Sequence, residues 1–210
     1  MVLPLYLAMS ALELQPIPHG AFLVLDHTEV PPPGILPVIT DHFPLDGQVL
    51  ARICQGREAV VLDFEQPPTP ERRAMLRGFP CPCAAPPGYC DDGPVFLPPA
   101  PLRTPLEVYL APFQGREIWL EAALQQQTIT VTARGTTITP PSPSRGLTGG
   151  FYEKHLRCRF TQDFSRDRAV FTLFDTPETL REKLAHAAAL GVTRAIGLYG
   201  ELGGKPAEAY

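Results

Sequence analysis

Eight short apolar runs occur along the chain, and each predicts a buried β-strand. Most are nearly continuous in apolar residues, which is typical of parallel strands covered on both faces. Polar residues gather at the C-terminal ends of several runs, and parallel barrels build their sites at that edge. The runs are Leu3–Ala8, Ala21–Asp26, Ile35–Thr40, Ala59–Phe64, Pro80–Ala84, Pro94–Leu97, Glu117–Ala122 and Thr193–Leu198.

Four segments between these runs carry helix start and stop signals. Each begins with an oxygen-bearing side chain that can cap free backbone N–H groups, and each ends at a glycine. Residues 104–107, Thr-Pro-Leu-Glu, predict a capping box with proline at the first helical position. The predicted caps are Asp46, Thr69, Thr104 and Thr176, and the helices are expected to stop at Gly56, Gly78, Gly115 and Gly191.

The other connections, residues 14–20, 30–34 and 89–93, are too short or too rich in proline for a helix. Up to half of the usual outer helices are therefore expected to be missing. Covering apolar area stabilises a fold by roughly 25 cal/mol per Å². We therefore expect proline-rich loops or a partner subunit to cover that side, and a homodimer would supply such a partner. The pattern predicts an α/β fold, a minimal (β/α)8 TIM-type barrel.

A long segment between the seventh and eighth runs, residues 125–174, is predicted to be a β-rich insertion. Thr128–Thr132 and Thr136–Thr139 alternate threonine with Ile or Val around a central Gly135, which predicts a hairpin. Leu156–Phe160 and Ala169–Phe174 predict a second antiparallel pair. The Pro/Ser/Gly-rich stretch 140–150 is expected to be mobile. A chain of 210 residues suits one such barrel, so residues 1–210 are expected to form a single domain.

Charge and hydropathy narrow the classes of partner. The net charge is −4 and no Lys/Arg-rich run occurs, so nothing in the sequence supports nucleic-acid binding. No apolar stretch approaches the ~18 residues that span a bilayer, so no membrane span is predicted. The apolar residues 1–14 lack a positive n-region and include Pro4 and Glu13. This start argues against a secretory signal and predicts a cytoplasmic protein.

The five cysteines are an odd number in a chain without an export signal, so a disulfide framework is not expected. They are Cys54, Cys81, Cys83, Cys90 and Cys158. Three of them lie within ten residues, which raises the question of a metal site. Their spacing is not that of CxxC pairs, however, and no histidine lies nearby. Buried thiols are therefore favoured, and neither a metal nor another cofactor is predicted.

Two carboxyl groups on the fourth predicted strand are the strongest candidates for chemistry. Residues i and i+2 of a strand point the same way, so Asp63 and Glu65 are predicted to face the barrel interior. Leu62 and Phe64 then face the outer helices. Acids on an inner face are costly to bury without a task or a partner. Hydrogen bonds to loop amides or an ion pair with arginine would also account for them, but we favour a functional site.

The chain resembles the family 18 glycoside hydrolases, which include chitinases and spore-associated N-acetylglucosaminidase-type enzymes. Residues 58–65, Glu-Ala-Val-Val-Leu-Asp-Phe-Glu, match the family signature Asp-Gly-x-x-Asp-x-Asp-x-Glu at its final Asp-x-Glu. The β-rich insertion after strand seven is similar to the small α+β element of the family. Residues 171–203 resemble its closing helix and eighth strand.

This resemblance implies a retaining, substrate-assisted hydrolysis of glycans that contain N-acetylglucosamine, such as peptidoglycan or a chitin-like polymer. The acetamido oxygen of the substrate attacks the anomeric carbon, so no protein nucleophile is needed. Carried over by position, Glu65 would be the general acid, and Asp63 would orient the acetamido group. The resemblance also implies an association with spores.

Four more residues are predicted to contact the glycan. Trp119 and Glu121 share one face of the seventh strand, although Trp119 also fits a plain core position. Tyr6 stands where an inward-facing aromatic is common on strand one of the family. Tyr199 stands near the tryptophan that floors the sugar site in the family.

The chain departs from the family pattern at three points. Val61 replaces the middle aspartate of the signature, strand six (95–97) has no tyrosine, and strand eight ends without a tryptophan. Two alternatives are therefore kept: a catalytically impaired protein that binds a glycan or a protein partner, and a structural or assembly module. His27 and His42, just past strands two and three, are expected to be loop residues.

Overall fold

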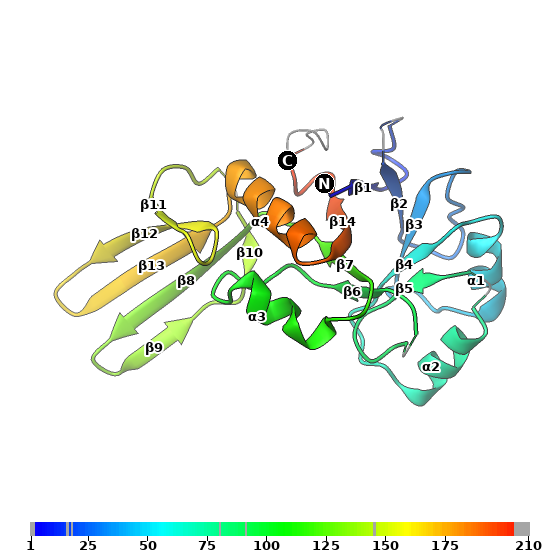
Figure 1. The fold of residues 1–210 in the computed structure, drawn as a ribbon, viewed down its shortest axis with the longest axis horizontal. Coiled ribbons are helices and arrows are strands. Elements are labelled where there is room, and N and C mark those ends of the chain that lie inside the picture. Colours follow the sequence, from blue (N-terminus) through cyan, green and yellow to red (C-terminus); the bar gives the residue numbers. More distant parts are fainter. Residues whose placement is uncertain are drawn as a thin grey trace.

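The structure is a computed structural model that describes residues 3–15, 17, 19–79, 81–90, 92–144 and 146–203. Within these residues the chain forms a parallel sheet of eight strands and an antiparallel sheet of six strands. The antiparallel sheet projects to one side of the parallel one, and helix α4 lies between them in the view of Figure 1.

The parallel sheet follows the order β5-β4-β3-β2-β1-β14-β7-β6. A parallel bridge between Ala85 and Val95 joins its two edges, so the sheet curls into a nearly closed barrel. The eight predicted strands and the minimal TIM-type barrel are confirmed, although Pro80, the start of the fifth predicted strand, lies outside the described residues. The strands are β1 (Leu5–Met9), β2 (Gly20–Val24), β3 (Leu36–Thr40), β4 (Val60–Asp63), β5 (Cys83–Ala84), β6 (Val95–Leu97), β7 (Ile118–Glu121) and β14 (Val192–Leu198).

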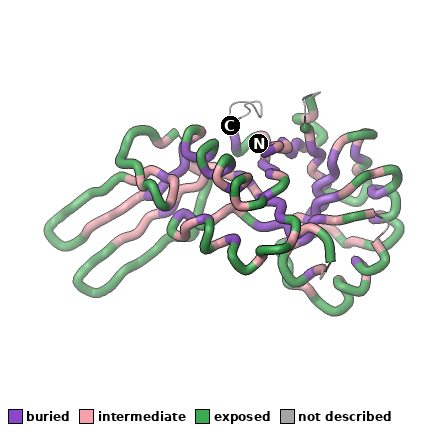
Figure 2. Tube along the Cα trace, in the orientation of Figure 1, coloured by how far each residue is buried: buried purple, intermediate pink, exposed green. Residues whose placement is uncertain are grey.

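Alternate residues of each barrel strand pack into two separate layers, as strand geometry requires. On β4, Val61 joins the interior cluster that includes Phe96 and Trp119. Its neighbours Val60 and Leu62 instead pack in an outer cluster with side chains of the first two helices. Figure 2 shows the buried positions gathered along the barrel strands. The predicted inner and outer faces of β4 are therefore confirmed.

The helices begin where the sequence predicted, with one exception. Asp46 accepts hydrogen bonds from the amides of Gln48 and Val49, both at 2.8 Å. Thr176 and Thr179 cap each other's backbone N–H groups. The helices are α1 (Gly47–Cys54), α2 (Pro70–Arg77), α3 (Leu106–Leu110) and α4 (Pro177–Ala189), and a 3-10 turn, η1 (Ala111–Phe113), follows α3. In the described part of the chain, no helix combines the length and apolarity that crossing a membrane would need.

The exception is the start of α3, where the predicted capping box is wrong. Pro105, not Thr104, occupies the N-cap position, and no side chain caps the helix. Thr104 lies one residue too far upstream, in a turn whose amide bonds the carbonyl of Pro101 at 3.1 Å. The dihedral angles of Pro105, φ −54° and ψ 140°, keep it outside the helix. The same Thr-Pro pair begins α2 and α4 with a threonine cap, so the proline by itself does not account for the shift at α3.

The barrel face that lacks helices is covered by this same chain. The outward side chains of β1 and β2 are buried, including Leu7 and Val24 at 0 % exposure. Ile17 from the β1–β2 connection and two leucines of α4 pack near β1, and Leu14 and α1 pack near β2. Arg57 donates a hydrogen bond to the carbonyl of Ile35 at 3.2 Å and so holds the proline-rich β2–β3 connection. Loops, together with α1 and α4, therefore cover this side of the barrel.

The insertion forms the antiparallel sheet, in the order β10-β8-β13-β12-β11, with β9 paired to β8. Both predicted strand pairs are confirmed: β8 with β9 and β12 with β13. Part of the stretch 140–150, which was expected to be mobile, forms the short strand β10, and Arg145 lies outside the described residues. The strands are β8 (Gln125–Thr132), β9 (Gly135–Ile138), β10 (Ser142–Pro143), β11 (Phe151–Glu153), β12 (Cys158–Phe164) and β13 (Arg168–Phe174).

Candidate functional site at the mouth of the barrel

A cavity of about 770 Å³ lies at the C-terminal edge of the barrel strands. Thr40, Asp63, Glu121 and Leu198, the last residues of β3, β4, β7 and β14, all line it. Parallel barrels place their sites at this edge because loops from several strands converge there. The cavity is also lined by two carboxylates that follow β4 and β14 and by four aromatic rings: Glu65, Glu201, Phe64, Phe96, Tyr109 and Phe113.

Asp63 and Glu121 are the two carboxyl groups set most deeply in this cavity. Burial raises the pKa of Asp63, and the neighbouring charge of Glu65 raises it further. Burial also raises the pKa of Glu121 to about 8, with added repulsion from Asp63 and Glu201. Glu121 therefore holds its proton at neutral pH. The site offers a protonated acid on β7 near a carboxyl group on β4.

Glu65 reaches the cavity from the loop after β4, and Asp41 fixes the start of this loop. The side chain of Asp41 accepts hydrogen bonds from the amides of Glu65 and Gln66 at 3.1 and 3.0 Å. Arg72 on α2 pairs with the same carboxylate at 2.6 Å. Although burial opposes ionisation, the bonds from Arg72 and the two amides lower the pKa of Asp41. The Glu65 side chain is itself exposed at the cavity mouth.

Tyr109 is a site residue that the sequence analysis missed. It comes from α3, and its hydroxyl donates a hydrogen bond to the carbonyl of Pro98 at 2.8 Å. Burial, together with the nearby Glu121, raises the pKa of Tyr109 to about 12, so the phenol stays protonated. Strand β6 supplies Phe96 to the same cavity. The helical periodicity of 106–110 could have placed a tyrosine on α3, but not its approach to β7.

The three other predicted glycan contacts do not line this cavity. Trp119 is 1 % exposed, and its indole nitrogen donates a hydrogen bond to Glu117 at 2.8 Å. The guanidinium of Arg194 lies 4.4 Å from the Trp119 ring centroid and 5.7 Å from that of Tyr6. Trp119 and Tyr6 belong to the interior cluster of the barrel. Tyr199 is half-buried against the outer cluster.

The two histidines lie where loop residues were expected. His42 is exposed and lines the cavity, so it stands near Asp63, where its charge lowers the pKa of that carboxyl when protonated. The backbone carbonyl of His27 accepts a hydrogen bond from Arg52 on α1. Among the described residues, no group of three or more His, Cys, Asp or Glu side chains is arranged to hold a metal ion.

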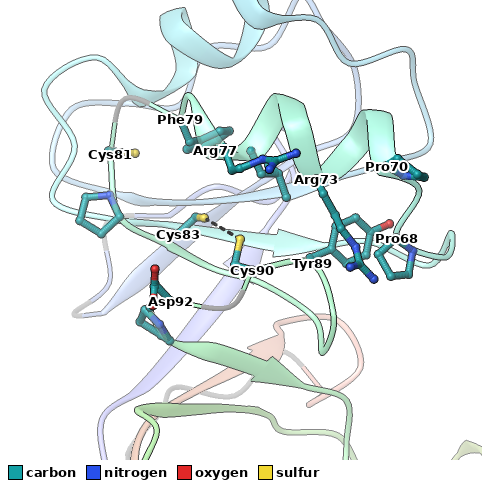
Figure 3. A pocket seen from close by; sticks show the side chains of 14 residues that line it. Pro68, Pro70, Arg73, Arg77, Phe79, Cys81, Cys83, Tyr89, Cys90 and Asp92 are labelled. Atoms are coloured by element: carbon teal, nitrogen blue, oxygen red, sulfur yellow. Dashed lines mark hydrogen bonds between the residues drawn. The ribbon is translucent and has the colours of Figure 1, made fainter.

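A second cavity, of about 830 Å³, lies on the outer side of the barrel between α2 and the segment around β5. Arg73 and Arg77 extend from α2 along it, and the thiols of Cys81, Cys83 and Cys90 line it (Figure 3). The two cavities share no charged side chain. Four carboxyl groups line the cavity at the barrel mouth, whereas Asp92 alone lines the second cavity, so we take the cavity at the barrel mouth as the candidate active site.

Comparisons with known proteins give little further information about this chain. No protein-family model matches the chain, and no curated protein matches it. Among solved structures, the crystal structure of the Bacillus cereus spore cortex-lytic enzyme SleL is similar, with a TM-score of 0.49 and 10% sequence identity. The match covers 93% of this chain and 70% of that one. A likeness at this TM-score and identity assigns no activity to this chain.

Proposed function

We propose that this chain is a glycoside hydrolase-like protein that acts on glycans containing N-acetylglucosamine, either peptidoglycan or a chitin-like polymer. The observation that carries the proposal is the 770 Å³ cavity at the mouth of the barrel, which combines buried carboxyl groups with aromatic walls. Sugar rings present apolar faces that pack on aromatic side chains, and their cleavage needs a proton donor near the glycosidic oxygen.

In the proposed reaction, Glu65 protonates the glycosidic oxygen while the acetamido oxygen of the substrate attacks the anomeric carbon. The C–O bond to the leaving sugar breaks, and water later opens the cyclic intermediate with net retention. Asp63 orients the acetamido group and stabilises the positive charge that develops on it. Asp63 and Glu65 stay within reach of one sugar ring because both line the cavity from β4 and the loop that follows it.

In this proposal Glu121 replaces a carboxyl group that the chain lacks at position 61, where the family signature has an aspartate and this chain has Val61. Val61 is fully buried in the barrel interior and offers no proton to Asp63. Glu121 is a protonated acid at neutral pH and interacts electrostatically with Asp63. We infer that it supplies from β7 the neutral carboxyl that β4 lacks, and that it donates a hydrogen bond to the bound sugar.

The test is hydrolysis of chromogenic N-acetylglucosamine oligomers and purified peptidoglycan by the wild type and three variants, Glu65→Gln, Asp63→Asn and Glu121→Gln. Removing a general acid typically lowers kcat by 10²–10⁴-fold, so Glu65→Gln should lose nearly all activity. Glu121→Gln should retain part of it, because glutamine still donates a hydrogen bond. Asp163→Asn, which neutralises an exposed carboxylate on β12 far from the barrel mouth, is the matched control.

The outcomes separate the proposal from its alternatives. Wild-type hydrolysis that Glu65→Gln abolishes and Asp163→Asn retains supports the enzyme. If the wild type is inactive but the oligomers raise its melting temperature, the chain is a glycan-binding protein with an impaired site. If the wild type neither hydrolyses the oligomers nor is stabilised by them, the assembly module is the better account. The cytoplasmic location, the spore association and the homodimer stay predictions, and sedimentation of the purified chain tests the last.

A further inference from the structure

Two cysteine side chains that were expected to be buried are only half-buried, and they lie close together at the second cavity. The Sγ atoms of Cys83, on β5, and Cys90, seven residues later, are 3.9 Å apart (Figure 3). A turn reverses the chain between them, with Gly88 at φ 84° and the amide of Tyr89 bonded to the carbonyl of Pro86 at 3.2 Å. The fold thus brings both sulfurs to one place independently of the barrel-mouth site.

Both thiols can be reached from the cavity. Of the other three cysteines, two are buried and one has a thiol neighbour of its own. Cys83 and Cys90 are half-buried and line its wall. Cys54 and Cys158 are 3 % and 0 % exposed. Cys81 also lines the cavity, but its thiol interacts with that of Cys54. A reagent that enters the cavity therefore meets the Cys83–Cys90 pair directly.

The cavity also carries charge that favours one kind of reagent. Arg73 and Arg77 are exposed on α2 and line the cavity, and Asp92 is its one acidic lining residue. Fixed guanidinium groups attract carboxylate-bearing molecules and hold them by charge-assisted hydrogen bonds. A small anionic disulfide, of the class of oxidised glutathione, has both the volume and the charge to enter.

We propose that Cys83 and Cys90 form a reversible intrachain disulfide by exchange with a small anionic disulfide bound between α2 and β5. One thiolate attacks the small disulfide, forming a mixed disulfide and releasing one small thiol. The second thiolate then attacks the protein sulfur of this mixed disulfide and releases the second small thiol. The two protein S–H protons end on the two released thiols, and the protein loses two electrons.

The new bond would lie at the seam of the barrel. Between the two cysteines stands Ala85, whose bridge to Val95 joins β5 to β6 and completes the curl of the sheet. Its amide bonds the carbonyl of Pro94 at 3.2 Å, and its carbonyl accepts from Phe96 at 2.8 Å. A covalent loop around Ala85 restricts the unfolded chain in this segment, so the oxidised form should melt a few degrees higher.

The experiment uses the full chain, reduced, desalted and incubated with oxidised glutathione at low ionic strength. Trypsin should release residues 78–103 as one peptide, because no Lys or Arg lies inside this segment. We expect this peptide to lose the mass of two hydrogens, with no fragment ions between Cys83 and Cys90, and to regain it after reduction. Cys83→Ser and Cys90→Ser should each abolish the loss, and Cys81→Ser and Cys158→Ala should keep it.

A mass loss that survives Cys83→Ser or Cys90→Ser overturns the pairing, as does a stable glutathione adduct without ring closure.

A second measurement tests the role of the two arginines. Arg73→Gln and Arg77→Gln together should slow the exchange with oxidised glutathione several-fold, and should leave unchanged the exchange with cystamine, a cationic disulfide. Equal slowing with both reagents overturns the binding of an anionic disulfide. Near-UV circular dichroism confirms that each variant is folded.

Discussion

The barrel and the antiparallel sheet are both built from β-strands, yet they bury their side chains differently. The five residues of β3 are all buried, and so are the first three residues of β7. In the antiparallel sheet, β9 is wholly exposed, and β12 has one buried residue, Cys158. Its core is a small cluster of Cys158, Leu173 and Leu102, the last from the β6–α3 connection. The sequence patterns differ in the same way: continuous apolar runs against alternating threonine.

This contrast shows which part of the fold carries stability and which part offers surface. Parallel strands must be covered on both faces, so a change inside the barrel removes contacts on every side. The antiparallel sheet keeps aromatic side chains exposed, among them Phe151 at 58% and Phe164 at 63% exposure. Each of these two rings contacts one neighbouring ring, Phe160 or Phe171, and leaves more than half of its surface exposed. Four substitutions test this contrast, from the largest expected effect to the smallest.

Trp119→Ala should have the largest effect. Trp119 is 1 % exposed at the centre of the barrel interior, and its ring stacks with the Arg194 guanidinium. Truncating a buried tryptophan leaves a cavity and lowers the free energy of unfolding by roughly 3–5 kcal/mol. Urea denaturation measures this loss. A loss below about 1 kcal/mol would show that the barrel interior is loosely packed, and the barrel would then not differ from the antiparallel sheet in its packing.

Lys183→Met tests the junction between the two regions. The Lys183 ammonium pairs with Asp175 at 2.6 Å, and both side chains are almost completely buried. Burial raises the pKa of Asp175, and the lysine opposes this shift. Removing the lysine leaves an uncompensated buried carboxylate and should lower the free energy of unfolding by roughly 3 kcal/mol at pH 7. The double variant that adds Asp175→Asn is the control, and it should recover part of the loss.

Glu121→Gln should change the pH dependence of stability. The native pKa of Glu121 is raised from 4.5 to about 8, so its contribution to stability is fully present below pH 4.5 and is lost as the pH rises to about 8. Glutamine has no such dependence. The variant should match the wild type in stability near pH 4 and exceed it at pH 8.5, where the wild type must either ionise a buried carboxyl group or lose stability. Thermal melts at both values check this, and equal melting temperatures at pH 8.5 would count against a buried Glu121.

Phe164→Ser should have the smallest effect. Phe164 lies at the exposed end of β12 and contacts Phe171 edge-to-face, with ring centroids 5.9 Å apart. Surface substitutions usually change the free energy of unfolding by no more than about 0.5 kcal/mol. Urea denaturation under the conditions used for Trp119→Ala gives the comparison. A loss above about 2 kcal/mol would mean that the antiparallel sheet contributes to the global stability as strongly as the barrel does.

Only some residues of the candidate site could be placed from the sequence. Asp63 and Glu65 were predicted to face the cavity because the period of two along a strand is a local property. The same parity placed Trp119 and Glu121 on one face of β7, and both were predicted to contact the glycan. Glu121 is two residues nearer the C-terminal edge and lines the cavity, whereas Trp119 packs in the barrel interior. Only the packing of the interior decided that the cavity does not extend to Trp119. Asp41 follows β3 directly, so the strand pattern placed it at this edge, but its bonds to the amides of Glu65 and Gln66 depend on the packing of two loops. Tyr109 reaches the site through the packing of α3, which no local pattern encodes.

The sequence by itself determined the strands, three of the four helix starts and the β-rich insertion, because apolar periodicity, caps and turn residues act over a few neighbouring positions. The tertiary structure decided which residues meet. It set Cys83 beside Cys90 and put Glu121 near Asp63, although 58 positions along the chain separate the last two. The approach of Glu121 to Asp63 depends on how a closing sheet brings distant strands together, whereas Cys83 and Cys90 meet through the turn between them. The pKa of Glu121 follows from the burial and charge at its position.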